Sequence, residues 1–304
     1  MGTVSHSEVD SYLLCRRKHY YGYGLSLQRI SESHSLAMGT AGHRILEAFY
    51  QTIADEETVE AQARMFEAAI GVARAEYDEI VAEGYEEASN RVALFHALFD
   101  PSWGYFSQEP YVRNGWRILA VEADFTLLYD EETDSKYPFV VDMIAVDPDG
   151  DTVVIDHKFV YDFYTPEATD LQPQIPKYIG ALRALGYNVA YGAYNMVRTR
   201  KIKEPTPEQM HHMMMLKPNT TRVKATFLEQ ISVANEIQAL KTLPLEEQDA
   251  RAYRVANKMV CQSCSFRDIC STELTGGNVE LMIRTEYKIR ERREFTTTNE
   301  KEEN

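Results

Sequence analysis

The sequence predicts an α/β protein with a mixed central sheet, and two features of the chain lead to this prediction. First, residues 116–160 contain three β-rich segments separated by turn signals, the last of which is PDGD at 148–151. Second, helical patterns stand on both sides of these segments, and another apolar strand pattern follows at 188–197. Helices, three strands, a helix and a further strand form the order expected of an α/β core.

The part of the chain that precedes the strands is expected to be helical. Apolar residues Met38, Ile45, Phe49 and Ile53 recur near helical spacing, and a later run of helix formers closes on Gly84, where a C-cap would stand. The helices predicted in this part are 5–24, 35–53, 57–84 and 86–100.

The elements that follow are predicted from the same periodicities. Strands are expected at 116–130, 137–147, 151–160 and 188–197, with helices over 171–185 and 226–242 and a charged helix after a cysteine-rich segment. Residues 137–160 are therefore expected to form a hairpin whose two strands carry Asp142 and Asp156.

Length and composition indicate a single large domain. The chain has 304 residues, 44% of them hydrophobic, and no segment has the composition of a linker. One domain over 1–295 is expected, with a helical insertion at about 55–105, a cysteine-rich segment at about 255–275 and a flexible tail at 296–304. Without a signal-peptide pattern or an apolar run of roughly 20 residues, a cytoplasmic location is expected, in the host if a virus encodes the chain, with no membrane contact.

The charge balance excludes one class of function. A formal net charge of −15 argues against a generic nucleic-acid coat, but not against a nucleic-acid enzyme, because local fields decide binding. Basic clusters occur in CRRKHYYGY at 15–23, RTRKIK at 198–203 and RTEYKIRERREF at 284–295. Each of them is either a solvated surface or part of a binding face.

An acid and a base stand two residues apart at the end of an apolar strand, in VVIDHKF. Asp156 and Lys158 share one face of that strand because side chains alternate. With Asp142 on the neighbouring strand, about 4.8 Å away, two carboxylates converge and can bind a hard cation such as Mg²⁺. A lysine beside that cation can orient water or neutralise charge on a phosphoryl group, although the same pair alone could be a surface ion pair.

Two further motifs bear on this choice. GTAGHRILEAF places His43 in a helix among small residues, and QIPKY puts Gln174 and Tyr178 one helical turn apart. These motifs, in the order helix with histidine, strand with Asp, strand with D-x-K and helix with Q-x-x-x-Y, resemble the RecB-like branch of the PD-(D/E)xK nuclease superfamily. The resemblance extends from about residue 10 to 272.

The resemblance implies a restriction-endonuclease-like core and a role for each matched residue. It implies that His43, Asp142 and Asp156 bind Mg²⁺ or Mn²⁺, with the backbone carbonyl of His157 as a further ligand, and that Lys158 acts in catalysis. It also implies that two residues contact DNA near the scissile phosphate, namely Gln174 and Tyr178.

The chain departs from this family pattern at two places. Phe139 stands where such families often have Gly, three residues before the first Asp. Pro173 and Pro176 crowd the Q-x-x-x-Y helix, and Pro176 is tolerated only in a first turn, so this helix is expected to begin near Gln174. Without the family context, Tyr178 would be interpreted as an aromatic of the core.

The four cysteines of the chain are Cys15, Cys261, Cys264 and Cys270. Four thiolates suit an iron–sulfur cluster or a structural zinc, whereas a disulfide framework is not expected in a cytoplasmic chain. One distant cysteine followed by a C-x2-C-x5-C triplet resembles the iron–sulfur RecB-like nucleases, including AddB and the CRISPR-associated adaptation nucleases. That resemblance implies a 4Fe–4S cluster joining the N- and C-terminal segments, with zinc and unligated thiols as alternatives.

The function predicted is a metal-dependent DNA nuclease, an exonuclease acting on DNA ends or single strands in recombination, repair or viral genome processing. The alternative is a clamp or assembly module of a recombination or CRISPR-adaptation complex that binds DNA without cutting it. A helicase or an integrase as partner protein, or no partner, remain open. No phosphate-binding loop of the G-x-x-x-x-G-K-[ST] type appears, so ATP-driven unwinding is not expected.

Two further features are given ordinary interpretations. Glu122 in LAVEADF is expected to be a solvated strand acid, with a role beside the metal as the alternative. The run MHHMMML at 210–216 is expected to pack in the core, because two adjacent histidines face different ways and do not share a metal.

Overall fold

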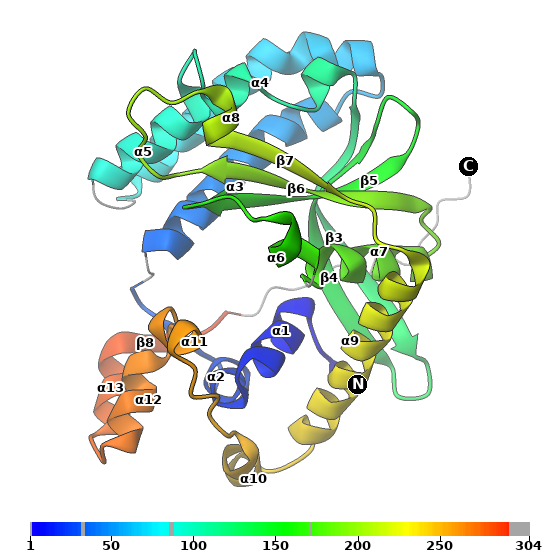
Figure 1. Ribbon diagram of the computed structural model, residues 1–304. Helices are drawn as coiled ribbons and strands as arrows, with labels where there is room; N and C mark the ends of the chain where they lie inside the picture. The colour runs from blue at the N-terminus through cyan, green and yellow to red at the C-terminus, as the bar shows by residue number, and fades with distance from the viewer. Residues whose placement is uncertain (1, 32–33, 85–87, 171, 292–304) are drawn as a thin grey trace. The chain divides into compact units, whose positions relative to one another are not determined.

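The computed structural model describes residues 2–31, 34–84, 88–170 and 172–291, which form two compact units (Figure 1). The first unit comprises residues 1–33, 124–139 and 228–304, and the second comprises residues 34–123 and 140–227. The expected tail at 296–304 and the start of the expected helix at 86–100 lie outside the described residues. A single domain over 1–295 remains a prediction.

Helices form the first part of the second unit. Thr58 caps one of them, because its side chain accepts a hydrogen bond from the backbone N–H of Ala61, and Gly84 follows its end with a left-handed φ of 86°. The Gln62 side chain donates to the carbonyl of Ile118 over 2.8 Å and ties this helix to the first long strand. The elements are α3 (His34–Ala54), α4 (Val59–Ala82), α5 (Ala88–Phe99), and the 3-10 turns η2 (Tyr105–Ser107) and η3 (Val112–Asn114).

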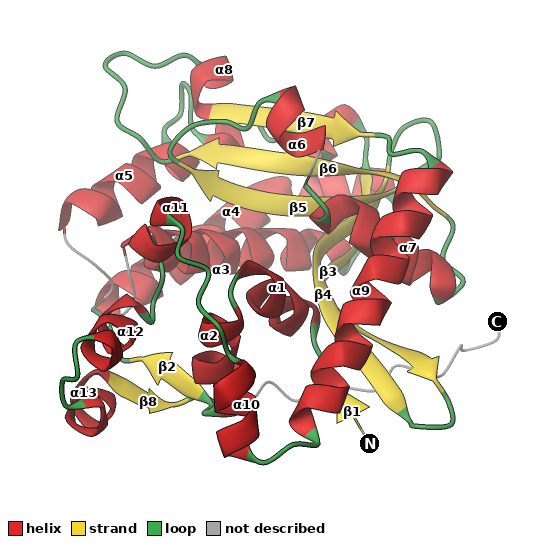
Figure 2. Ribbon diagram, turned by 60° about the horizontal axis from the view of Figure 1, so that its bottom comes forward, coloured by secondary structure: helices red, strands yellow, loops and turns green. Residues whose placement is uncertain are grey.

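The strands confirm the expected hairpin and mixed sheet (Figure 2). In the turn of this hairpin, the Asp147 carboxylate accepts hydrogen bonds from the N–H groups of Asp149 and Asp151, and Gly150 has a φ of 89°. β3 pairs with β4. The pairs β4–β5 and β6–β7 are antiparallel, and the pair β5–β6 is parallel. The strands are β3 (Arg117–Asp130), β4 (Ser135–Val146), β5 (Thr152–Val160), β6 (Val189–Arg198) and β7 (His211–Leu216); the helices among them are α6 (Pro166–Asp170), α7 (Gln174–Ala184) and α8 (Pro207–Met210).

The methionine–histidine run is the clearest difference from the expected elements. It forms β7, an edge strand on β6. Met210 and Leu216 are buried and Met213 packs against the core, whereas Met215 is 42% exposed. An edge strand buries at most one face, so alternating residues of the run remain at the surface. The core-packing interpretation is therefore confirmed for Met210, Met213 and Leu216 and wrong for the exposed residues His212 and Met215.

Glycines set how closely the helices of the second unit approach its sheet. A Cβ on Gly42 would lie 2.3 Å from the ring of Phe159, so α3 packs directly on β5. A Cβ on Gly192 would lie 2.4 Å from Ile175, so α7 packs just as closely on β6. These close approaches bring α3 and α7 near the two strands on which Asp142 and Asp156 stand.

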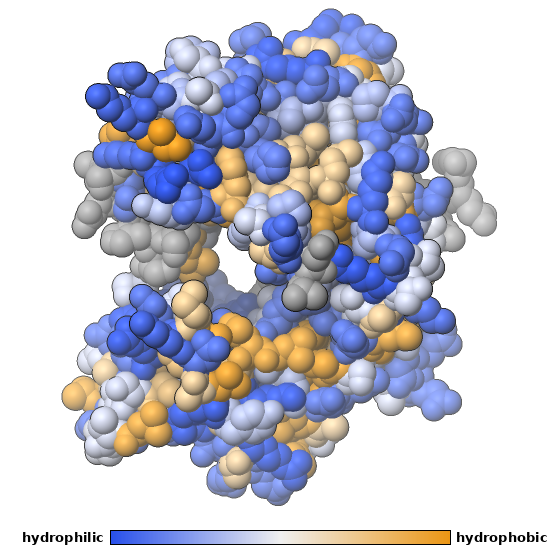
Figure 3. Space-filling model, viewed as in Figure 1, coloured by the Kyte–Doolittle hydropathy of each residue, from blue (hydrophilic) through white to orange (hydrophobic). Residues whose placement is uncertain are grey.

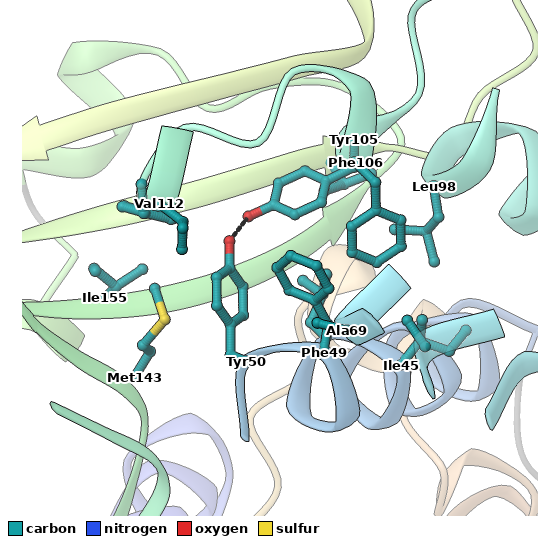
Figure 4. Close-up of a cluster of buried hydrophobic side chains, with 14 of the residues drawn as sticks. Ile45, Phe49, Tyr50, Ala69, Leu98, Tyr105, Phe106, Val112, Met143 and Ile155 are labelled. Carbon is teal, nitrogen blue, oxygen red and sulfur yellow. Dashed lines mark hydrogen bonds between the residues drawn. The ribbon is translucent and has the colours of Figure 1, made fainter. Parts of the chain in front are cut away.

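Aromatic side chains dominate the core of this unit (Figure 4). Phe49 packs edge-on against Tyr50 and Phe66 and lies 4.7 Å from Phe106, ring centre to ring centre. The hydroxyl groups of Tyr50 and Tyr105 are hydrogen-bonded at 2.5 Å inside this core. The core therefore contains a buried polar contact that needs further partners.

The first unit is mainly helical. The helix expected at 5–24 is broken at Cys15, whose extended backbone (φ −166°, ψ 119°) ends one helix and begins the next. Helix α9 starts at Thr220, earlier than the expected 226, and its part after residue 227 belongs to this unit. The elements are β1 (Gly2–Thr3), α1 (His6–Leu14), α2 (Arg16–His19), the π-turn η1 (Tyr20–Gly24), β2 (Leu27–Arg29), α9 (Thr220–Lys241), α10 (Leu245–Arg251), α11 (Lys258–Gln262), α12 (Arg267–Leu274), α13 (Val279–Glu286) and β8 (Tyr287–Ile289).

Short strand pairings connect segments of this unit that are far apart in the sequence. β2 pairs antiparallel with β8, and β1 pairs parallel with the start of β4. Beneath the first pair, Phe266 stacks on Tyr287 and lies 5.6 Å from Tyr21. No helix among the described residues has both the length and the apolar character to cross a membrane.

Candidate active site

The β4–β5 hairpin brings the two predicted aspartates to one place in the second unit. Met143 pairs with Ile155, which puts Asp142 and Asp156 at the adjoining position of the two strands. The backbone N–H of His157 donates a 2.7 Å hydrogen bond to Oδ2 of Asp142. The Asp142 carboxylate is therefore oriented by the strand that carries Asp156.

Three side chains in this unit are close enough to share one metal ion. The ligand atoms of His43, Glu122 and Asp142 all lie within 4.8 Å of one another. His43 Nδ1 is 3.5 Å from Asp142 Oδ2 and 3.8 Å from Glu122 Oε1. The sequence left Glu122 open between a solvated strand acid and an acid beside the metal, and its place in this group favours the second interpretation.

The backbone at Glu122 explains how an acid of a regular strand pattern reaches this site. Glu122 has a φ of +46°, a left-handed conformation that side chains other than glycine adopt at a cost of order 1 kcal/mol or more. This conformation interrupts the alternation of side chains along β3, and the side chain of Glu122 is only 23% exposed. Such backbone strain occurs mainly where function requires a particular side-chain position.

The remaining predicted residues gather around Asp156, which is 1% exposed. Lys158 Nζ lies 2.6 Å from Asp156 Oδ2, and Gln174 Nε2 donates to Asp156 Oδ1 over 2.6 Å. Gln174 also donates to the hydroxyl of Tyr178 over 3.3 Å. α7 begins at Gln174, so Pro176 falls in its first turn, as expected for a tolerated proline.

The electrostatics of the site indicate an excess of buried negative charge. Burial, assisted by the charge of Asp156, raises the pKa of Asp142 to about 7. Burial would lower the pKa of His43, but its hydrogen bond to Glu122 and the charge of Asp142 outweigh that effect and raise it. Burial also opposes the charge of Lys158, yet Asp156 and Asp142 raise its pKa, so its ammonium group stays protonated at neutral pH.

A chain of buried hydrogen bonds fixes the His157 side chain from behind. The Asn195 amide donates to His157 Nδ1 over 2.7 Å and to the Tyr105 hydroxyl over 2.9 Å. The Tyr50 hydroxyl, bonded to Tyr105, donates to Glu109 over 2.7 Å, and the Tyr50 ring stacks on the His157 ring at 5.6 Å. Because both amide hydrogens of Asn195 are donated, His157 Nδ1 is the acceptor and its proton stands on Nε2.

The first unit brings the four cysteines into one neighbourhood. The backbone of Val255 contacts two of them, with its N–H 3.5 Å from Cys15 Sγ and its carbonyl 3.7 Å from Cys261 Sγ. Burial raises the pKa of Cys264, and the charges of Cys15 and Cys261 act in the same direction. All four cysteines are free of disulfide bonds.

An arginine–carboxylate network braces the fourth cysteine. Arg254 Nε donates to Cys270 Sγ over 3.2 Å, and its Nη2 is paired with Glu273. Glu273 also accepts from the Tyr21 hydroxyl over 2.5 Å and pairs with Arg17, which is 5% exposed. The position of Cys270 is therefore fixed relative to the segment that follows Cys15.

Comparisons with known proteins identify the superfamily of the chain. A family model described as the PD-(D/E)XK nuclease superfamily matches residues 3–271, and the chain belongs to that superfamily. None of the curated proteins is detectably similar to it. Among solved structures, the chain is similar to "Crystal structure of SSO0001", with a TM-score of 0.38 and 12% identity over 88% of this chain and 85% of the other.

Membership of this superfamily makes the chain a nuclease with DNA as the implied substrate, in a group of enzymes that use divalent metals. The α/β architecture with a mixed sheet flanked by helices is consistent with a restriction-endonuclease-like fold.

Proposed function

We propose that His43, Asp142 and Asp156, together with Glu122, hold Mg²⁺ or Mn²⁺ in a site that hydrolyses DNA as an exonuclease, at ends or on single strands. The observation that carries this proposal is the ligand-capable group of His43, Glu122 and Asp142 beside the Asp156–Lys158 pair. Carboxylate oxygens suit both cations, and an imidazole ligand favours Mn²⁺ over Mg²⁺. The backbone carbonyl of His157 is proposed as a further ligand.

The bound cation would supply a polarised phosphoryl oxygen and a water of lowered pKa. The raised pKa of Lys158 assigns it a role as a fixed positive charge next to the phosphoryl oxygens, because a protonated amine does not accept a proton. Gln174 orients Asp156 through its 2.6 Å hydrogen bond, so this carboxylate would be held in one orientation when a cation binds. Tyr178 supports Gln174 from the next turn of α7.

The test is cleavage of end-labelled single- and double-stranded DNA by wild type and Asp156→Ala, with Mg²⁺ or Mn²⁺ and with a chelator. We expect cleavage by wild type with a cation present, no cleavage with the chelator, and loss of activity in the variant. Mononucleotide products released progressively from one end support the exonuclease mode, whereas internal cuts contradict it. Cleavage that survives the chelator or the substitution contradicts the metal site.

We further propose that Cys15, Cys261, Cys264 and Cys270 bind a 4Fe–4S cluster. Cys15, Cys261 and Cys264 lie near one another and Cys270 belongs to the same unit, which supports a shared group. The Arg254 contact to Cys270 is the kind of N–H···S hydrogen bond that cluster thiolates accept. Anaerobic purification followed by iron, sulfide and zinc analysis tests this. Equal amounts of iron and acid-labile sulfide support the cluster, and one zinc per chain contradicts it.

A further inference from the structure

The parallel strands β5 and β6 end together and place an aromatic segment beside a basic one. Val160 pairs with Arg198, and the N–H of Thr199 donates to the carbonyl of Val160 over 2.9 Å. Both arrows point to the same edge of the sheet in Figure 2. The segment YDFY at 161–164, which leaves β5, therefore lies against RTRKIK at 198–203, which leaves β6.

Two arginine–aromatic pairs form where these segments meet. The guanidinium carbon of Arg200 lies 5.4 Å from the ring centre of Tyr161, and that of Arg198 lies 4.0 Å from the ring centre of Phe163. Tyr161 is 68% exposed, so an aromatic ring with a cation at its side is available at the surface. In proteins that bind single strands, bases stack on aromatic rings while neighbouring arginines bind the phosphates.

The local charge is opposite to that of the whole chain. RTRKIK contains four basic residues and no acid within a chain whose net charge is −15, and its residues Lys201 and Lys203 are exposed. Figure 3 colours the surface around the loop from β6 to α8 mostly as hydrophilic. Asp162, 3.1 Å from Arg200 and 3.7 Å from Arg198, is the acid that pairs with these arginines. The Arg200–Asp162 pair is exposed, and exposed ion pairs contribute under about 1 kcal/mol, so a phosphate can replace Asp162 on Arg200. Arg198 is only 13% exposed and donates to the carbonyl of Gln209, so it holds Phe163 in place.

The position of these pairs relates them to the candidate active site. Tyr161 comes directly after the last residue of β5, Val160, and three residues after Lys158, which limits the distance between the two Cα atoms to about 10 Å. Both belong to the second unit. A DNA strand whose scissile phosphate lies at Lys158 can therefore reach Tyr161 within a few nucleotides.

We propose that Tyr161, Phe163, Arg198 and Arg200 form a platform that binds single-stranded DNA beside the scissile phosphate. A base stacks on Tyr161 and a phosphate binds Arg200, while Arg198 and Phe163 support them from below the surface. This inference rests on the proposed nuclease function and specifies its substrate as an unpaired strand. A stacked base must be separated from its neighbours, and an unpaired strand permits this without loss of base pairs.

Binding of fluorescent oligo(dT) to the full chain, measured by anisotropy in EDTA, tests the platform without cleavage. We expect Tyr161→Ala to weaken binding roughly 5- to 100-fold and to leave its salt dependence unchanged, because stacking releases no counterions. Tyr161→Phe should restore most of the lost affinity. Arg200→Ala should weaken binding and reduce the slope of log K against log salt by about 0.7, the value for one phosphate contact on a single strand.

Arg64→Ala is the matched control, since Arg64 is exposed on α4 and its loss changes the net charge equally. The platform is contradicted if Arg64→Ala weakens binding as much as Arg200→Ala, or if Tyr161→Ala binds oligo(dT) like wild type. It is also contradicted if Tyr161→Ala weakens binding to a blunt duplex as much as binding to oligo(dT). Unchanged thermal unfolding of each variant excludes a folding defect. Wild type that binds oligo(dT) through Tyr161 but cuts no DNA with Mg²⁺ or Mn²⁺ would contradict the proposed function and leave the platform intact.

Discussion

The backbone N–H of His157 holds Oδ2 of Asp142 at 2.7 Å, while the side chain of His157 is held by Asn195 in the interior of the second unit. One residue of β5 thus connects a candidate metal ligand to a buried hydrogen-bond network. The network continues to the buried carboxylate of Glu109, whose raised pKa results from burial. The geometry of the site therefore depends on side chains that do not touch the metal-binding group.

Removal of Asn195 should destabilise the protein and weaken metal binding. Asn195→Leu leaves His157 Nδ1 and His211 Nε2 without their Asn195 partner, at a cost of about 1–3 kcal/mol for each group. It also takes one hydrogen bond from the Tyr105 hydroxyl, which keeps Tyr50. We expect the free energy of unfolding to fall by roughly 2–4 kcal/mol in urea titrations, and Mn²⁺ affinity to fall as well. Met196→Leu on the same strand conserves volume and should cost under about 1.5 kcal/mol. Equal losses in the two variants would contradict a role for the network.

The pKa of Asp142 predicts a pH dependence for stabilisation by Mg²⁺. Its folded value of about 7 is above its ordinary value of 3.8, so between these pH values the folded chain keeps a proton that the unfolded chain has lost. The contribution of this group to stability therefore falls as the pH rises from about 4 to about 7. A cation must displace that proton, so the shift in melting temperature caused by Mg²⁺ should be small at pH 5.5 and largest above pH 7.

The Asp142→Asn variant provides the control for this dependence. Its side chain keeps an acceptor for His157 but carries no charge, so the metal-free variant should exceed wild type in stability at pH 8 by roughly 1–4 kcal/mol. At pH 4 the two should be nearly equal, because the wild-type carboxyl is then protonated in the folded state. A stability difference that does not change with pH would contradict the raised pKa.

Glu122 should contribute to metal affinity at a cost in backbone strain. Glu122→Gln should weaken Mn²⁺ binding by about 10-fold or more, because a neutral amide replaces one charged ligand of the group. Glu122→Gly should lose the metal too, but its metal-free form should be as stable as wild type or more so, since glycine adopts a φ of +46° without strain. Glu67→Gln, on the exposed face of α4, should leave metal binding unchanged. Calorimetric titration with Mn²⁺ measures all three.

Lys158 should affect the rate of cleavage and not the binding of metal. Lys158→Met removes a positive charge next to Asp156, so kcat should fall by about 10²–10³, while Mg²⁺ affinity stays the same or rises. Lys224→Met, an exposed lysine of α9, should change neither quantity. A parallel loss of kcat and Mg²⁺ affinity in Lys158→Met would show that the lysine mainly organises the site.

The strands and their acids were predictable because they follow local rules. The turn at 148–151 fixes the hairpin, and alternation along β5 puts Asp156 and Lys158 on one face. The first turn of α7 was also predictable, because Pro176 is tolerated only there. His43 belongs to α3, which is far along the chain from these strands. The close packing of Gly42 on Phe159 brings it near the acids.

Glu122 and Asn195 were not predictable, for different reasons. The left-handed backbone at Glu122 has no sequence signature within the strand pattern, so the sequence left its carboxylate open between solvent and a place beside the metal. Asn195 is a polar residue in an otherwise apolar strand. Its partners Tyr105 and His211 come from other segments of the chain, so the strand pattern gives no sign of their hydrogen bonds. The break at Cys15 is of the same kind, because its extended backbone interrupts a sequence with continuous helical character.

The four cysteines should act as one unit in stability. If they share a cluster, each single Cys→Ser substitution releases the same cross-link between the two ends of the chain, and chain entropy gives such a link a value on the order of 4 kcal/mol. Cys15→Ser and Cys261→Ser should therefore lower the melting temperature by similar amounts, and the double variant should lower it no further. Iron content should fall to background in all three. Small and additive effects with iron retained would instead describe independent thiols.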